Sequence, residues 1–503
     1  MKHIYLLLLV FSIQIAIAQE EEDLCRIVNS ERSAAAKMLN FTQNVNTQNY
    51  DVTYHELRFT VDPAVYHING VVKTTFKALS PMNSVVFDMA TELVVSSVTM
   101  NNLAVSYTQS NYELVITLPS TLATGNSATV VITYEGNPPN GEDAFTIGTH
   151  PATNGTAVLY TLSEPYGARD WWPCKQDLNE KVESIDVYIT APLNYVSVSN
   201  GLEVNQTTSG NFKTTHFHHG YPIPAYLIAI AVTNYQVYNQ QGGLGTTASP
   251  TFPIVNYLYP ESAAINITNL APTPSIINFY ESKFGNYPFR NEKYGHAQFG
   301  WGGGMEHTTV SFMGGFSRSL IAHEMGHQWF GNKITCGTWK DIWLNEGITE
   351  YLSGLVVEHL DGNTDFINWK GAKTIDITSQ AGGAVYLTDD EILNVSRIFS
   401  RRLTYYKGAM VVNMLRYKMG DTAFFQAMNN YLSDPNLAYG YAVTSEFKAH
   451  LETVYQNSLT EFFNDWVYNQ GYPTYTIQAE NISSNQVKIT INQTQSHSSV
   501  SFF

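Results

Sequence analysis

The sequence predicts a multidomain α+β protein: an N-terminal antiparallel β-sandwich-like domain, then a mainly helical domain, then the start of a further β domain. Three observations predict this. The chain has 503 residues, and average domains run to roughly 100–200 residues. Short alternating segments with frequent turn signals fill residues 51–238, and helical periodicity follows beyond residue 262. Alternation returns after residue 472.

The composition excludes several classes of protein. Apolar residues make up 44% of the chain and charged residues 14%, against about a quarter in typical domains. This is enough apolar material for a sizeable core, and too little charge for a coiled coil or a charge-driven disordered chain. The net charge is −16, which repels phosphate backbones, so we expect no nucleic-acid partner.

Residues 1–18 predict a secretory signal peptide. Lys2 supplies a basic start, Ile4 to Ile13 form an apolar run, and Ala16 to Ala18 form a small-residue exit. The run is short for a bilayer span of ~20 residues, so we prefer cleavage after Ala18 to an uncleaved anchor. No later stretch is long and apolar enough to span a membrane. We therefore expect an exported protein, either secreted, periplasmic or at the cell surface.

Residues 19–240 form the predicted N-terminal β domain. Apolar residues alternate along 128–134 and again along 185–189, as expected of strands with one buried face. A cluster of Asn, Pro and Gly at 137–141 separates such runs, which is typical of an antiparallel sheet with tight turns. The Gly-rich segment near residue 240 marks the predicted boundary.

Residues 241–472 form the predicted helical domain. Ser317 to Phe330 has the pattern of one helix. Residues 338–341 look like a capping box that opens a second helix toward Leu360, with Gly362 as its stop. Later helices are predicted over 407–418, 423–432, 445–455 and 459–469.

Residues 473–503 predict the opening hairpin of a β-sandwich domain, because alternation recurs over 476–478 and 487–491. Two strands alone are marginal in water, so we expect this domain to be truncated. The three cysteines, Cys25, Cys174 and Cys336, make no disulfide framework, and their spacing favours no pair. We expect them to be small buried thiols.

The chemistry is concentrated in His323-Glu324-Met325-Gly326-His327, an H-E-x-x-H sequence. Residues at i and i+4 share one helical face, so both imidazoles can reach one metal ion. A hydrolytic zinc site needs three protein ligands and an open position. Glu346 follows His327 after eighteen residues, in an apolar segment that argues against a solvated surface acid. An antiparallel helix pair would bring it beside the histidines, so the sequence predicts one Zn²⁺ per chain on these three residues.

Glu324 is the predicted general base. It directly follows a ligand, so it points off the metal axis while remaining beside it. A carboxylate in that position can take the proton of an attacking water. The alternative is a solvated helix acid.

These residues resemble those of the gluzincin aminopeptidases, the aminopeptidase N and leukotriene-hydrolase group, in which H-E-x-x-H is followed by eighteen residues and a Glu within W-L-N-E-G. The resemblance covers roughly residues 50–475 and implies that 241–472 is a thermolysin-like catalytic domain. Four further segments match: Gly303 to Glu306 the G-x-M-E motif, Tyr405 to Ala409 the Y-x-K-G-A motif, Ser163 to Asp177 the N-terminal-domain segment that reaches the active site, and Asn286 to Phe289.

The resemblance implies further roles. Two carboxylates would face the free α-ammonium of a substrate, and Tyr405 would donate a hydrogen bond to the developing oxyanion. The glycines before Glu306 let a substrate backbone come close. The implied substrate-binding residues are Glu164, Gly303, Gly304, Met305 and Glu306.

Two further positions need a separate interpretation: one departs from the family's usual sequence, and the other lies outside its motifs. His307 stands where the family commonly has Asn after the Glu of G-x-M-E, which alters the amine site. Glu350 lies one turn after Glu346 and either orients a ligand histidine or is a solvated helix acid.

We therefore expect a zinc-dependent aminopeptidase that releases N-terminal amino acids from peptides with a free N-terminus, by attack of a metal-activated water. One alternative is a zinc endopeptidase, which would cleave amino-blocked peptides. The other is a catalytically dead peptide-binding surface protein, against which the intact H-E-x-x-H sequence argues.

Overall fold

The computed structural model describes residue 28 and residues 43–139, 144–150 and 155–502. The predicted signal peptide and Cys25 lie outside these residues, and the domain limits predicted above stay predictions. The chain packs as two compact units, one running to Gly337 with the return segment Pro435–Tyr441 added, and one formed by Thr338–Asp434 and the residues from Ala442 onward. Lys181 Nζ and the Thr335 N–H both donate to the Gly440 carbonyl, which ties the return segment to the first unit.

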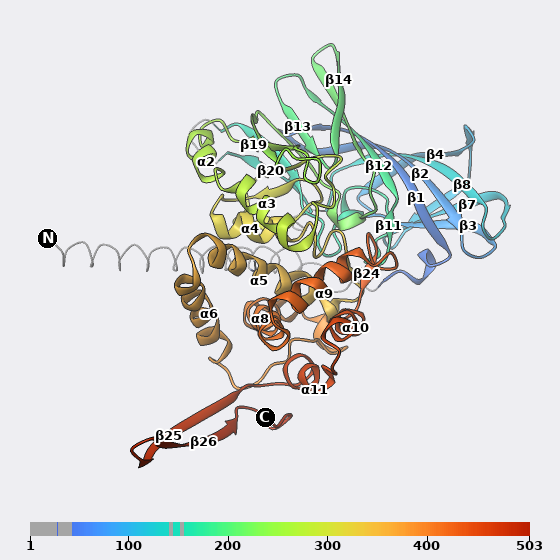
Figure 1. Ribbon diagram of the computed structural model, residues 1–503. Coiled ribbons are helices and arrows are strands. Elements are labelled where there is room, and N and C mark those ends of the chain that lie inside the picture. Colours follow the sequence, from blue (N-terminus) through green and yellow to red (C-terminus); the bar gives the residue numbers. More distant parts are fainter. Residues whose placement is uncertain (1–27, 29–42, 140–143, 151–154, 503) are drawn as a thin grey trace. The chain divides into compact units, whose positions relative to one another are not determined.

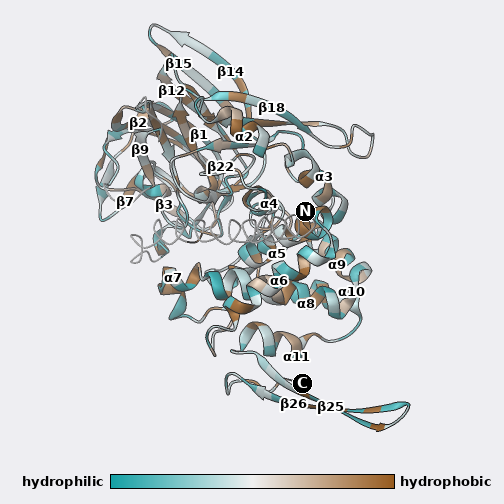
Figure 2. Cartoon of the chain, turned by 90° about the vertical axis from the view of Figure 1, so that its left-hand side faces the viewer, coloured by the Kyte–Doolittle hydropathy of each residue, from teal (hydrophilic) through white to brown (hydrophobic). Residues whose placement is uncertain are grey.

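The largest sheet of the first unit has eight strands in the order β14-β15-β12-β1-β2-β8-β4-β5 (Figure 1). Its inner strands β1, β2, β8 and β12 alternate between buried and less buried residues, whereas β14 is exposed along its whole length. Ile185, Val187 and Ile189 are buried as predicted. Figure 2 shows brown and teal mixed over the strands of this part of the chain. One pair differs from the antiparallel expectation, because β1 and β12 run parallel. The strands are β1 (Tyr50–Asp62), β2 (Val65–Ala78), β4 (Leu93–Met100), β5 (Leu103–Ala104), β8 (Ser127–Gly136), β12 (Ser184–Pro192), β14 (Leu202–Ser209) and β15 (Phe212–His219).

Smaller sheets complete the β-rich part, and their buried side chains share one hydrophobic core with the large sheet. That core includes Phe299, Met305 and Phe312, so it continues from the β domain into the strands that carry the predicted substrate loop. The strands are β3 (Met82–Asp88), β6 (Tyr107–Ser110) and β7 (Glu113–Leu122) in one sheet, β9 (Phe145–Thr149), β10 (Ala157–Thr161), β13 (Val196–Ser199) and β17 (Ile230–Thr233) in another, and the pair β11 (Lys181–Val182) and β16 (Ile223–Pro224).

A five-stranded sheet in the order β18-β19-β20-β22-β21 carries the site. Helices α3 and α4 pack together, and the Tyr280 hydroxyl donates to the Ala322 carbonyl at 2.9 Å. The elements are β18 (Gln236–Gly242), β19 (Phe252–Leu258), β20 (Tyr294–Gln298), β21 (Gly304–Met305), β22 (Ser311–Met313), α2 (Ala263–Asn269), α3 (Thr273–Phe284) and α4 (Arg318–Gly326).

Helix α4 begins as predicted but ends earlier. The Ser317 side chain caps its start by accepting from the Leu320 N–H. The prediction of a helix to Phe330 is wrong, because α4 ends at Gly326 and tight turns follow. The turns end at Gly331, which has a φ of +128° and donates its N–H to the Ile334 carbonyl. The chain changes direction at this glycine.

The second unit is mainly helical, as predicted, with the long helix α5 at its centre. The helices predicted near 407, 423, 445 and 459 are present, whereas α6 and a π-helical turn before α8 were not predicted. The elements are η4 (Trp339–Asp341), α5 (Trp343–Leu360), α6 (Asn363–Ile377), η5 (Glu391–Leu393), α7 (Val395–Ile398), η6 (Arg401–Lys407), α8 (Gly408–Met419), α9 (Asp421–Ser433), α10 (Thr444–Tyr455), α11 (Thr460–Phe463), η7 (Asn464–Tyr468), β25 (Pro473–Ser483) and β26 (Gln486–Gln495).

The capping box predicted at 338–341 is wrong. The Thr338 hydroxyl donates to the Asp341 side chain at 2.6 Å rather than accepting from the backbone. The other Asp341 oxygen accepts from the backbone N–H and the hydroxyl of Thr444, at 2.8 and 2.6 Å. Asp341 therefore joins the starts of two helices instead of capping one.

Two sequence expectations are met by simple findings. The predicted terminal hairpin forms as β25 and β26, which pair with each other alone among the described strands. Cys174 and Cys336 are buried free thiols. Among the described residues, no helix has both the length and the apolar character that crossing a bilayer requires.

Helices α5 and α8 pack against each other through two glycines. A Cβ built on Gly347 would lie 2.9 Å from the Cα of Gly408 and 3.0 Å from the Thr404 carbonyl oxygen, both backbone atoms that cannot move aside alone. Gly371 of α6, by contrast, faces open space.

We predict that Gly347→Ala destabilises the protein by about 1–3 kcal/mol, because the two helices must separate. The matched control, Gly371→Ala, should be neutral or stabilising by ~0.5–1 kcal/mol, since alanine is the better helix former. Thermal or denaturant unfolding of the two variants measures the difference. Equal stabilities would show that the close approach of α5 and α8 does not constrain this position.

Candidate active site

The two histidines of α4 lie side by side, as the i and i+4 spacing predicts. Their Nε2 atoms are 3.2 Å apart and both side chains are buried. The Nδ1 atom of His327 lies 3.2 Å from the Phe330 carbonyl oxygen, an acceptor. Nδ1 therefore carries the proton, and Nε2 presents a lone pair toward His323, which is the form of imidazole that binds a metal.

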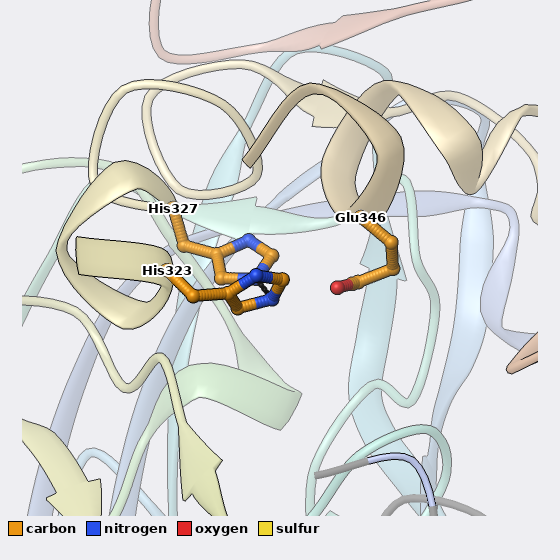
Figure 3. A group of neighbouring side chains, drawn as sticks. All are labelled: His323, His327 and Glu346. Atoms are coloured by element: carbon orange, nitrogen blue, oxygen red, sulfur yellow. Dashed lines mark hydrogen bonds between the residues drawn. The ribbon is translucent and has the colours of Figure 1, made fainter. Parts of the chain in front are cut away.

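Glu346 completes a donor set with these histidines. His323, His327 and Glu346 each offer one ligand atom, and the three atoms lie within 4.8 Å of one another (Figure 3). The figure shows the Glu346 carboxylate pointing toward the two imidazole rings. All three side chains are buried, and two imidazoles with one carboxylate are a donor set that hydrolytic zinc sites use. The residues present therefore fit a zinc ion.

Glu324 lies directly against the strand that precedes Glu306. A Cβ on Gly304 would sit 2.4 Å from Glu324 Oε1, so only glycine leaves room for the carboxylate beneath β21. Ligand atoms of Glu306, Glu324 and His327 also lie within 4.8 Å of one another. The structure thus brings the predicted base beside both the predicted amine-binding carboxylate and a metal ligand.

The site gathers buried carboxylates. Glu164 and Glu306, each 2% exposed, form a third such group with Glu346, again within 4.8 Å. Negative charges this close together repel one another, and burial removes the water that would otherwise stabilise them. The arrangement therefore favours cations, either a metal or an ammonium group.

Tyr405 lies in the π-helical turn η6 and is fully buried. Its predicted contact with a reaction intermediate stays a prediction. Glu350 is also buried, and its Oε1 lies 3.1 Å from Lys373 Nζ, which makes a buried ion pair with α6. This overturns the solvated-acid alternative for Glu350, while its action on a ligand histidine stays a prediction.

His307 adds no positive charge beside Glu306. Burial lowers the pKa of its imidazole to about 3, so the ring is neutral at physiological pH. The ring packs edge-on against Phe312 with centroids 4.4 Å apart. Within the described part of the chain, neither ring nitrogen has a hydrogen-bond partner.

Two buried amides that the sequence reasoning missed contact the backbone at Glu306. Gln328 Nε2 donates to the Glu306 carbonyl at 3.3 Å, and Asn332 Nδ2 donates to the same oxygen at 2.7 Å. The sequence did carry a signal, because both amides lie beside the aromatic pair Trp329 and Phe330 immediately after the H-E-x-x-H motif. Uncharged polar residues buried in such a segment need specific partners.

Two family models match the chain. The model described as the peptidase M1 N-terminal domain matches residues 46–227, and the model described as the peptidase family M1 domain matches residues 316–466. The chain belongs to the M1 peptidase family. The sequence-based resemblance to zinc aminopeptidases is thereby confirmed at the level of the family.

The relatives of this M1 chain are distant. Glutamyl aminopeptidase of Rattus norvegicus is 25% identical over 347 residues, which cover 64% of this chain and 36% of the relative. Aminopeptidase M1-C of Oryza sativa subsp. japonica is 25% identical over 360 residues, covering 64% and 38%. The matched part of the chain thus spans little more than a third of the length of these curated relatives.

A solved structure shares the fold. An M1 zinc metallopeptidase mutant from Deinococcus radiodurans, crystallised with a Tyr-Ser-Ala substrate, superposes with a TM-score of 0.69 at 24% identity. The match covers 83% of this chain and 94% of that one. The predicted order of a β domain, a helical catalytic domain and further strands is therefore confirmed. Together with the His323, His327 and Glu346 donors, the family assigns one zinc ion to the chain.

We predict that His323→Ala abolishes zinc binding, because one imidazole donor is lost from a set of three. Emission spectrometry of the dialysed protein should show zinc falling from about one ion per chain to near zero. Glu324→Gln is the matched control on the same helix and should keep its zinc. If His323→Ala still held one zinc ion per chain, His323 would not be a zinc ligand.

Proposed function

We propose that the chain is a zinc-dependent aminopeptidase that releases N-terminal amino acids from peptides with a free N-terminus. The observation that carries the proposal is the group of buried carboxylates, Glu164 and Glu306, beside the metal donors. A zinc site alone would serve an endopeptidase equally well. Two further buried carboxylates beside a metal site favour the binding of a second cation, and the α-ammonium of a peptide is such a cation.

The amine also explains why single residues would be released. The distance from an α-ammonium to the first peptide bond is fixed by one residue of covalent structure. A pair of carboxylates that holds the ammonium therefore places the first carbonyl group at the metal donors. A blocked or internal nitrogen carries no charge and cannot be held in this way.

The topology supports a peptide as the substrate. In the order β18-β19-β20-β22-β21 the last strand has a neighbour on one side only, among the described strands. An edge strand offers backbone N–H and C=O groups to an extended peptide. Gly303 and Gly304 leave the approach to that edge without side chains.

The chain's own residues supply proton transfer and positioning. A zinc ion held by His323, His327 and Glu346 supplies Lewis acidity, which polarises a carbonyl group and lowers the pKa of a water molecule. Glu324, held beneath β21, accepts the proton of the attacking water on its carboxylate and delivers it to the departing amine. We assign the Tyr405 hydroxyl the role of donor to the developing oxyanion.

We also propose that the protein is exported. The support is the sequence of residues 1–18, with Lys2, the apolar run Ile4–Ile13 and the small-residue exit at Ala16–Ala18. Expression in a secreting host should release a protein whose N-terminal residue is Gln19. A cell-retained protein that keeps Met1 would contradict export.

The test of the activity compares a free-amino peptide with its N-acetylated twin. Charge-assisted contacts contribute about 1.5–3 kcal/mol each, so Glu306→Ala and Glu164→Ala should each lower kcat/KM on the free peptide roughly 10- to 100-fold. The unmutated protein should not cleave the acetylated twin. Glu324→Gln keeps Glu164 and Glu306 but lacks the general base. Its kcat/KM should lie at least ~100-fold below that of the unmutated protein and sets the background of the assay.

Equal rates of the parent on the two peptides would overturn the aminopeptidase proposal and favour an endopeptidase. Activity that survives complete removal of zinc would overturn both.

A further inference from the structure

We infer that Gln328 and Asn332 form an amide clamp that fixes Glu306 relative to the metal ligand His327, and that this clamp sets the register of the substrate amine. The inference rests on the proposed aminopeptidase function and deepens it. Neither residue touches the substrate or the metal in this scheme; both are positioning residues that act through Glu306.

Asn332 bridges the two functional residues directly. Its backbone N–H donates to the His327 carbonyl at 2.9 Å, and its side-chain Nδ2 donates to the Glu306 carbonyl at 2.7 Å. One residue therefore holds the backbone of the metal ligand and the backbone of the amine-binding carboxylate at the same time.

Gln328, the neighbour of His327, grips the same loop at two points. Its Nε2 donates to the Glu306 carbonyl at 3.3 Å, and its Oε1 accepts from the Thr309 N–H at 3.0 Å. The amide thus spans the turn from Glu306 to Thr309 and is itself fully buried. A side chain with both a donor and an acceptor is required here, which explains why an amide serves and a hydroxyl would be too short.

The turn held by the clamp is strained. Thr309 has a φ of +69°, a conformation that β-branched residues rarely adopt. Such a conformation persists only where the surroundings over-determine it. Besides Gln328, the Gly201 N–H donates to Thr309 Oγ1 at 2.8 Å, and Asn200 Nδ2 donates to the Thr308 carbonyl at 2.8 Å. The loop that carries Glu306 is therefore fixed from both sides.

Neutrality of the clamp matters as much as its geometry. Glu306 already lies with Glu324 and His327 in a buried group of ligand atoms. A charged residue at 328 or 332 would change the electrostatics of these carboxylates, whereas amides satisfy the backbone without doing so. The clamp thus holds the loop, and the Glu306 carboxylate stays available to pair with the ammonium group of the substrate.

The first experiment compares the buried Gln328 with the half-buried Gln298. Gln328→Met removes the clamp amide at nearly constant length. Gln298→Met is the control, because Gln298 Oε1 accepts hydrogen bonds from the Tyr259 N–H, Ser262 Oγ and Asn266 Nδ2 rather than from the Glu306 loop. Melting temperature and zinc content are measured for both, and both variants should keep their zinc.

The readout is binding of a free amine. L-leucine amide and its N-acetyl twin are titrated calorimetrically into the zinc-loaded Glu324→Gln protein, which does not consume them. Gln328→Met in this background should weaken binding of L-leucine amide about tenfold, because a small misplacement of Glu306 is costly. Gln298→Met should leave the affinity within about twofold even if the melting temperature falls by the same amount.

A double-mutant cycle tests whether Gln328 acts through Glu306. In the Glu306→Ala background, Gln328→Met should have almost no further effect on binding of L-leucine amide, since the group it positions is gone. A full further tenfold loss in that background would overturn the clamp. If Gln328→Met does not fold, Asn332→Ala, which removes only the Nδ2 donor, takes its place in the same cycle.

The outcomes separate the two proposals. Preference of the parent for L-leucine amide over its acetylated twin, unchanged by Gln328→Met and by Asn332→Ala, overturns the clamp and leaves the aminopeptidase proposal standing. No preference in the parent overturns both, because there is then no amine register to set.

Discussion

The site depends on the cost of burying negative charge in one place. Glu164, Glu306, Glu324 and Glu346 all lie in the groups of buried ligand atoms. The neighbouring His307 is neutral, so it contributes nothing toward balancing them. A zinc ion on His323, His327 and Glu346 offsets part of this negative charge. In the proposed function the ammonium group of the substrate offsets more of it. His323 and His327 on α4 and the small Gly304 of β21 lie around these carboxylates.

The framework around these carboxylates is held by apolar packing and by hydrogen bonds to the backbone. The hydrophobic core of the β-rich part extends to Met305 and Phe312, so the strands that carry Glu306 are anchored in apolar packing. Tyr280 fixes α4 from behind by its bond to the Ala322 carbonyl. Packing and hydrogen bonds of this kind oppose relaxation of the loop and so help to keep charges of one sign together.

The sequence reveals local periodicity and local motifs well, because both are short-range. The buried alternation of Ile185, Val187 and Ile189 and the facing pair His323 and His327 follow from the periods of a strand and a helix. Tertiary partners are invisible at that range. Asp341 does not form the predicted capping box, because its side chain binds Thr444, which lies 103 positions further along the chain. Gln328 likewise donates to the carbonyl of Glu306, which lies 22 positions earlier. The family resemblance supplied Glu164 and Tyr405, which no local pattern identifies.

The return segment Pro435–Tyr441 has a consequence for how the chain is made. It belongs to the first unit and is held there through the Gly440 carbonyl, although 97 residues of the second unit, Thr338–Asp434, precede it. During synthesis from the N-terminus the first unit therefore stays incomplete until most of the second has left the ribosome. No single cut in the polypeptide separates the two units, so neither corresponds to a contiguous gene fragment.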